Sequence, residues 1–198
     1  MTAGIAILMA ELDSLRLEVQ RLKARLLEAE TAADEDPLTG VKNRRAFLRE
    51  LKRVMAFVQR YGAPASLVYV DIDDLKAIND RFGHAAGDAA LKAAAGALAE
   101  HVRESDVIGR LGGDEFAVLL VQADLGSAQA KAASLAEMVE AAPAVSGDWM
   151  IPVRVSWGAR QIDPAMEAEA LLAEADAAMF AMKRSRGSAA DADAADSP

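Results

Sequence analysis

The sequence of 198 residues contains no cysteine. Disulfide bridges, thiolate metal sites and cysteine nucleophiles are therefore excluded, which is consistent with a cytoplasmic protein. Long apolar runs are also lacking. The N-terminal run from Ile5 to Ala10 is too short to span a bilayer, and it has neither the basic flank nor the cleavage site of a signal peptide. We therefore expect a soluble protein with no membrane insertion.

Basic residues are scarce relative to acidic ones, 22 against 31, so the formal net charge is −9 at pH 7. This charge disfavours nucleic acid as a partner, and any bound phosphate must be met by local cations, backbone amides or metal. The hydrophobic content of 53% suffices for one domain of about 150 residues and an appendage.

The appendage is the N-terminal segment, where apolar residues recur at alternate spacings of three and four. They form a heptad seam with a positions Ile5, Leu12, Val19 and Leu26 and d positions Leu8, Leu15, Leu22 and Ala29. In a parallel dimer the facing g and e′ pairs all have opposite charge: Glu11–Arg16′, Glu18–Lys23′ and Arg25–Glu30′. Residues 1–33 are therefore predicted to form a parallel coiled-coil homodimer. A helix packed on its own domain is the alternative.

Residues 34–187 are predicted to form an α+β domain. It follows a small, acidic linker that ends at Pro37. We expect one helix ending near residue 60, further helices at 75–81, 86–102, 126–141 and 168–184, and strands at 66–72, 107–111, 116–121 and 149–162. This order indicates a sheet with helices packed on it. Residues 188–198 have almost no apolar bulk and are expected to be a disordered acidic tail.

Two of the expected strands are adjacent to acids. Gly112-Gly113 separates two apolar runs, which predicts a hairpin whose glycines supply the positive φ of a two-residue turn, and Asp114 and Glu115 follow at once. Asp71 ends a buried strand in the same way. Two such acidic ends suggest a metal site. A solvated hairpin tip and a helix N-cap at Asp71 are the alternatives.

The motifs identify a family resemblance. They are Asp-Pro-Leu-Thr-Gly-Val-Lys-Asn-Arg-Arg-Ala-Phe at 36–47, Asp-Ile-Asp-Asp-Leu-Lys-Ala-Ile-Asn-Asp-Arg-Phe-Gly-His-Ala-Ala-Gly-Asp at 71–88, Arg-Leu-Gly-Gly-Asp-Glu-Phe at 110–116 and Ala-Asp-Ala-Ala-Met-Phe at 175–180. Together they resemble the GGDEF family of diguanylate cyclases, which condense two GTP into cyclic di-GMP. The resemblance implies an α+β, adenylyl-cyclase-like domain with a central, mostly antiparallel sheet flanked by helices. The long coiled-coil helix predicted from the heptad spacing would precede this domain.

The resemblance also implies roles for particular residues. Asp71, the backbone carbonyl of Ile72 and Asp114 would hold Mg²⁺ (or Mn²⁺), with Asp114 near the attacking 3′-hydroxyl and Glu115 required beside it. Asn79 and Asp88 would read the guanine edge, because an amide can donate to O6 and a carboxylate can accept from N1 and N2. Cap or turn roles are their alternatives, and we interpret His84 as turn packing.

Contacts to the phosphates and along the hairpin are implied for Leu75, Lys76, Gly112, Gly113, Lys183 and Arg186. A solvated helix face is the alternative for Lys183. The family usually continues Lys-x-x-Gly-Arg-Asn, whereas this chain has Arg186-Gly187 with glycine and arginine exchanged. Arg186 is then the candidate to replace the usual arginine.

Arg103 and Asp106 match the family's inhibitory Arg-x-x-Asp site for cyclic di-GMP, with Arg110 assisting. An ion pair across one helical turn is the alternative. The implied function is a product-inhibited diguanylate cyclase that works as a homodimer with one GTP per domain. The other interpretations are a degenerate domain that senses GTP or cyclic di-GMP, and a coiled-coil interaction protein with a scaffold domain.

Overall fold

The computed structural model describes residues 9, 11–12, 15–23 and 33–195, the last ten of them as backbone only. The chain divides into two compact units, Met1–Glu35 and Asp36–Pro198. In the first unit residues 15–23 are helical, and four predicted seam residues are 49–55% exposed: Leu12, Leu15, Val19 and Leu22. The other seam residues and the Arg25–Glu30′ pair lie outside the described residues.

The second unit is built on a five-stranded sheet of order β1-β3-β4-β2-β7. The strands are β1 Lys42–Asn43, β2 Ala65–Ile72, β3 Val107–Gly112, β4 Glu115–Val121 and β7 Val155–Gln161. The short β1 pairs parallel with β3, and the other neighbouring strands pair antiparallel. The expected mostly antiparallel sheet is therefore confirmed.

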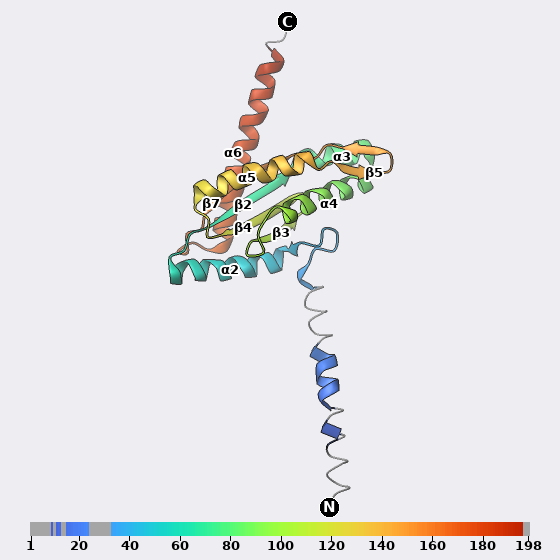
Figure 1. Ribbon diagram of the computed structural model, residues 1–198. Coiled ribbons are helices and arrows are strands. Elements are labelled where there is room, and N and C mark those ends of the chain that lie inside the picture. Colours follow the sequence, from blue (N-terminus) through green and yellow to red (C-terminus); the bar gives the residue numbers. More distant parts are fainter. Residues whose placement is uncertain (1–8, 10, 13–14, 24–32, 196–198) are drawn as a thin grey trace, which may run out of the picture. The chain divides into compact units, whose positions relative to one another are not determined.

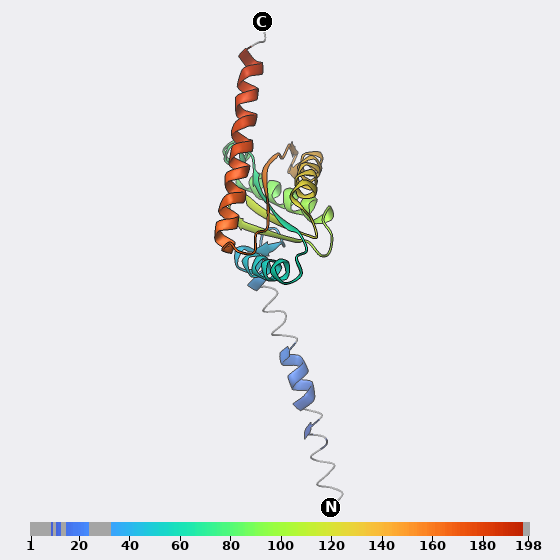
Figure 2. The ribbon, with the colours of Figure 1, turned by 90° about the vertical axis from the view of Figure 1, so that its left-hand side faces the viewer.

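Helices cover both faces of this sheet (Figures 1 and 2). They are α2 Arg44–Tyr61, α3 Leu75–Phe82, α4 His84–Glu100, α5 Leu125–Ala141 and α6 Ala168–Ala195. Val68, Val70 and Ile72 of β2 pack in the core formed with α4 and α5, whereas Leu67 and Tyr69 pack with α2 and α6. This alternation places the next odd-numbered residue of β2, Asp71, on the face that carries α6.

The sheet differs from the prediction at residues 149–162. In place of one long strand, β6 Trp149–Ile151 pairs with β5 Ala144–Ser146 in a separate two-stranded sheet, and β7 starts only at Val155. Pro152 stands between β6 and β7, and a proline cannot donate a ladder hydrogen bond, which explains the break.

Two further predictions need correction. Gly112 belongs to β3 and pairs with Glu115, so Gly113 and Asp114 are the central turn residues, and only Gly113 of the two glycines has a positive φ, 44°. In addition, the backbone of α6 continues to Ala195, through most of the segment expected to be disordered. The alanines there have high helix propensity, which favours continuation of the helix.

Two glycines let helices approach the sheet closely. A Cβ at Gly158 of β7 would overlap the main-chain nitrogen of Met179 and the carbonyl oxygen of Ala175, both in α6. A Cβ at Gly109 of β3 would lie 2.7 Å from the Cβ of Phe47 in α2. Because Lys183 lies about one helical turn beyond Met179, the fit at Gly158 also sets the position of Lys183.

Gly158→Ala is predicted to lower the free energy of unfolding by about 3 kcal/mol, since the obstructing atoms are helix backbone and the helix must shift. Gly96→Ala is the control. Gly96 lies in α4 and a Cβ there meets nothing within 4 Å. Gly96→Ala should instead raise the free energy of unfolding by about 0.5–1 kcal/mol, because alanine has the higher helix propensity. Chemical denaturation measures the free energy of unfolding of both variants, and equal changes in the two would contradict the packing argument.

Candidate functional site

The candidate site forms where the ends of β2 and β4 meet. The strands pair in a register that sets Asp71 opposite Glu115, and the Ile72 N–H donates to the carbonyl oxygen of Asp114 at 3.1 Å. The two acidic stretches singled out in the sequence therefore lie side by side at one edge of the sheet. The structure brings together Asp71, Ile72, Asp114 and Glu115.

Lys183 reaches this edge from α6. Its Nζ donates to Asp71 Oδ1 at 2.5 Å and lies 3.5 Å from Asp73 Oδ1. The Oγ of Ser156, a buried residue on β7, donates to the same Asp73 oxygen at 2.8 Å. Lys183 is thus engaged with the site and is not simply part of a solvated helix face. Sequence reasoning assigned no role to Asp73 or Ser156, although Asp73 lies within the acidic run.

Carboxylates outnumber cations at this point. Burial raises the pKa of Asp71, and the charges of Asp114 and Asp73 act in the same direction, so the pKa stays raised despite the ion pair with Lys183. Burial alone would lower the pKa of Lys183, but Asp71 and Asp73 outweigh it and raise that pKa. The edge therefore has an excess of negative charge that suits a further cation.

The donor set fits a hard divalent cation. Mg²⁺ is commonly bound by one or two carboxylates, with water and substrate phosphate completing its coordination. Asp71, Asp114 and the Ile72 carbonyl would supply such a partial set. Within the described ranges, no group of three or more acidic or histidine side chains is arranged to hold a metal. Additional ligands would accordingly come from a bound molecule or from water.

Glu115 is held from the opposite strand. Tyr69 is almost fully buried two residues before Asp71, and the Glu115 carboxylate acts on its hydroxyl. Burial, and after it this carboxylate, raise the pKa of Tyr69, so the phenol stays protonated beside Glu115. Tyr69 was missed because the sequence shows it only as one apolar residue of a buried strand.

The two predicted guanine-reading residues lie on neighbouring helices. Asn79 is on α3 and Asp88 is on α4, with only Gly83 between the helices. A Cβ at Gly87 would overlap the Oδ1 of Asn79, so the Asn79 side chain lies directly against the backbone next to Asp88. Gly87 is a further residue that sequence reasoning quoted in a motif without giving it a role.

The remaining phosphate candidates have simpler placements. Leu75 and Lys76 form the first turn of α3, where backbone N–H groups have no partner within the helix. His84 is the first residue of α4. Arg186 lies in α6, but its side chain is outside the described part of the chain.

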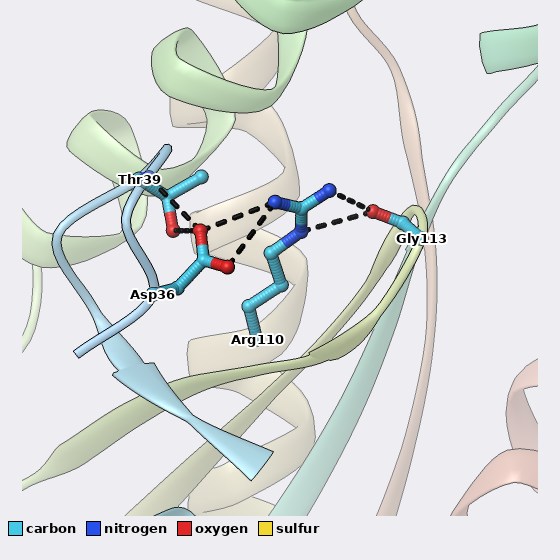
Figure 3. A network of polar contacts seen from close by, with 4 residues as sticks. All are labelled: Asp36, Thr39, Arg110 and Gly113. Carbon is cyan, nitrogen blue, oxygen red and sulfur yellow. Dashed lines mark hydrogen bonds and ion pairs between the residues drawn. The ribbon is translucent and has the colours of Figure 1, made fainter. Parts of the chain in front are cut away.

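Arg110 holds the hairpin turn (Figure 3). Its Nε and Nη2 donate to the Gly113 carbonyl at 3.0 and 2.6 Å, and its Nη1 donates to Asp36 Oδ1 at 3.1 Å. Asp36 Oδ1 also accepts from the backbone N–H and the hydroxyl of Thr39, at 2.9 and 2.7 Å. Arg110 therefore joins the first residue of the second unit to the turn beside Asp114.

Arg103 and Asp106 form a separate turn at the other end of β3. Asp106 accepts from the backbone N–H groups of Arg103 and Val121, each at 3.1 Å. This backbone turn replaces the ion pair considered as their alternative. Both residues line a cavity of about 430 Å³ together with Ser127, Lys131 and Ser134 of α5. The structure does not bring Arg110 to this cavity, because the Arg110 guanidinium is committed to Asp36 and Gly113.

Comparisons with known proteins agree on one family. The family described as "Diguanylate cyclase, GGDEF domain" matches residues 33–189. The diguanylate cyclase DgcP of Pseudomonas aeruginosa is 34% identical over 177 residues, which is 89% of this chain and 26% of DgcP. DgcS of Shewanella oneidensis is 32% identical over 93% of this chain and 61% of its own length. The chain thus spans only part of these relatives.

Solved structures give the same result. The coiled coil and GGDEF domain of DgcB from Caulobacter crescentus, in complex with c-di-GMP, superposes with a TM-score of 0.82 at 28% identity, covering 90% of this chain and 95% of that one. Diguanylate cyclase SiaD from Pseudomonas aeruginosa, in complex with its activator SiaC, has a TM-score of 0.77 at 31% identity, covering 89% and 68%. No helix of the described residues is long and apolar enough to cross a membrane.

The Asp36 network predicts a pH-dependent contribution to stability. Burial alone would raise the pKa of Asp36, but the hydrogen bonds from Thr39 and Arg110 outweigh it and hold the pKa below its usual value of 3.8. The stabilisation is therefore present above pH 3.8 and is lost as the pH falls through the lower, folded-state value.

Asp36→Asn should cost about 1–3 kcal/mol at neutral pH, because Arg110 loses a charged acceptor. The difference from the wild type should shrink below pH 3.8. Urea denaturation across a pH series measures it, with Asp80→Asn, an exposed aspartate on α3, as the control. A difference that stays constant with pH would contradict the assignment.

Proposed function

The chain belongs to the GGDEF family of diguanylate cyclases, and on that premise we propose that it condenses two GTP molecules into cyclic di-GMP and two pyrophosphates. The observation that carries the proposal is that Asp71 and Asp114 meet at one edge of the sheet, where Lys183 donates to Asp71. In the reaction each 3′-oxygen forms a bond to the α-phosphorus of the other nucleotide, and the bond to the departing pyrophosphate breaks.

The edge of the sheet that carries Asp71, Asp114 and Glu115, called the acidic edge below, is proposed to bind the reacting end of GTP. Mg²⁺ or Mn²⁺ held by Asp71, Asp114 and the Ile72 carbonyl would supply positive charge that activates the 3′-hydroxyl and stabilises the phosphoryl oxygens. Asp114 is assigned the position beside the 3′-hydroxyl. The protonated Tyr69 phenol acts on the Glu115 carboxylate, which supports a positioning role for Glu115 next to Asp114. Lys183 is proposed to contact the β- and γ-phosphates. When GTP binds, Lys183 gives up its hydrogen bond to Asp71 and makes this contact instead.

The guanine base is proposed to bind at helices α3 and α4. Asn79 donates to O6 and Asp88 accepts from N1 and N2, and the Asn79 side chain lies against Gly87, the residue that precedes Asp88. Adenine would leave these polar groups without partners, so ATP should be a poor substrate.

The reaction requires two copies of the domain, because each is assigned one GTP and the product contains two. The exposed seam residues Leu12, Leu15, Val19 and Leu22 support a parallel coiled coil as the dimer contact. Joining two domains in this way raises their mutual concentration without adding a contact between them.

Product inhibition is assigned to the cavity at Arg103 and Asp106. Arg103 can contact phosphate or stack on guanine, and each carboxylate oxygen of Asp106 has a lone pair left for a guanine edge. Lys131 adds a second cation to the same cavity. Arg110 is not part of this assignment.

Asp114→Ala should lower the formation of cyclic di-GMP from GTP by at least about 100-fold, since it removes a group next to the reacting oxygen. Pyrophosphate release and cyclic di-GMP are followed with Mg²⁺ present, with ATP alone and Asp148→Ala, an exposed turn residue, as controls. A wild-type dimer that binds GTP but yields no product would favour a nucleotide sensor over an enzyme.

Arg103→Ala should raise the concentration of cyclic di-GMP needed for half-inhibition by about 10-fold or more, because a charged contact to phosphate is lost. Initial rates measured with added product test this, and Arg53→Ala on α2 is a control of the same charge change. Unchanged inhibition in Arg103→Ala would place the inhibitory site elsewhere.

A further inference from the structure

A second cavity, of about 720 Å³, adjoins the acidic edge and extends towards β7 and α5. Asp73 and Ser156 line it beside Lys183, and Glu140 of α5 lines it from the other side. Two cations lie among its described lining residues, Lys183 and Arg154. The mechanism above uses Lys183 but gives Arg154 no role.

Arg154 is tied to the site through its backbone. Its carbonyl oxygen accepts the N–H of Asp73 at 2.9 Å, and the Asp73 carboxylate lies 3.5 Å from Lys183 Nζ. Arg154 also immediately precedes β7, whose Ser156 pairs with Asp71 and donates to Asp73. The backbone hydrogen bond to Asp73 therefore fixes the backbone of Arg154, from which its side chain extends, beside the residues that contact Lys183.

The guanidinium of Arg154 is free to change partners. Its Nε donates to Glu140 Oε1 at 2.9 Å, in a pair whose side chains are 72% and 56% exposed. Exposed pairs of this kind contribute little, whereas arginine binds phosphate bidentately and more strongly. A multiply charged phosphate entering the cavity would therefore displace Glu140 from Arg154.

We propose that Arg154 is a second cation for the terminal phosphates of the nucleoside triphosphate, acting from β7 while Lys183 acts from α6. The assignment rests on the proposed function, because it takes the triphosphate to lie against Lys183. It also answers an electrostatic problem of the cavity. Asp73, Asp74, Glu137 and Glu140 line it, and without Arg154 the only cation among its described lining residues would be Lys183, which leaves a surplus of charge of the same sign as the triphosphate.

The test measures binding separately from turnover. Titration calorimetry on the full chain with Mg²⁺ compares GMP with a GTP analogue carrying a methylene bridge between the α- and β-phosphates. Arg154→Gln should weaken the analogue by about 10-fold and leave GMP unchanged, since GMP lacks the terminal phosphates. Glu140→Gln should tighten the analogue, because it removes a competing acceptor and a negative charge.

Arg160→Gln is the matched control. Arg160 also lies on β7 and is paired at 3.8 Å with an exposed glutamate, Glu174, but it does not line the cavity. It should leave both affinities unchanged. Thermal melting of all three variants checks that they fold equally.

The outcomes separate the inference from the proposed function. Three results would overturn the role of Arg154. Arg154→Gln could bind the analogue as tightly as the wild type does, or its affinity for GMP could fall as much as its affinity for the analogue. Finally, Glu140→Gln could lose the same affinity for the analogue as Arg154→Gln. The last result would show that the ion pair matters only for structure. If neither the wild type nor Arg160→Gln binds the analogue, the proposed function fails and the inference fails with it.

Discussion

The register of β2 against β4 fixes where Asp71, Asp114 and Glu115 lie. With Asp71 opposite Glu115, the Ile72 N–H reaches the Asp114 carbonyl, and Asp71 falls on the face covered by α6. A slip of one residue would turn Asp71 towards α4 and α5 and away from Lys183. The buried, alternating side chains of β2 prevent this slip, because each face has its own core. The hydrophobic core therefore determines the chemistry at the strand end.

Negative charge exceeds positive charge at this edge of the sheet. One lysine faces Asp71, Asp73 and the nearby Asp114, which keeps the pKa of Asp71 raised even though it is paired. A protein that had to be stable without ligands would gain from a second cation here. The excess negative charge instead favours a bound cation, and in the proposed function Lys183 is the group that leaves the carboxylates for a phosphate.

Much of this arrangement could be predicted from the sequence. Periodicity located all the long helices and the three central strands, and strand ends rich in acids located Asp71 and Asp114. The partners of these residues could not be predicted locally. Tyr69 meets Glu115, Ser156 meets Asp73 and Arg110 meets Asp36 only through strand pairing and helix packing. The hairpin was misjudged by one residue because two adjacent glycines suit the same turn.

The glycines at 87, 109 and 158 have a consequence for how this domain can vary over evolutionary time. Each lies where another side chain or a helix backbone leaves no space for one more carbon. Any point substitution of glycine adds at least that carbon, so a change at one of these three positions requires a neighbouring group to move as well. At Gly158 that group is the backbone of α6, whereas at Gly87 it is the Asn79 side chain. Gly96 has no such neighbour, so a substitution there requires no second change.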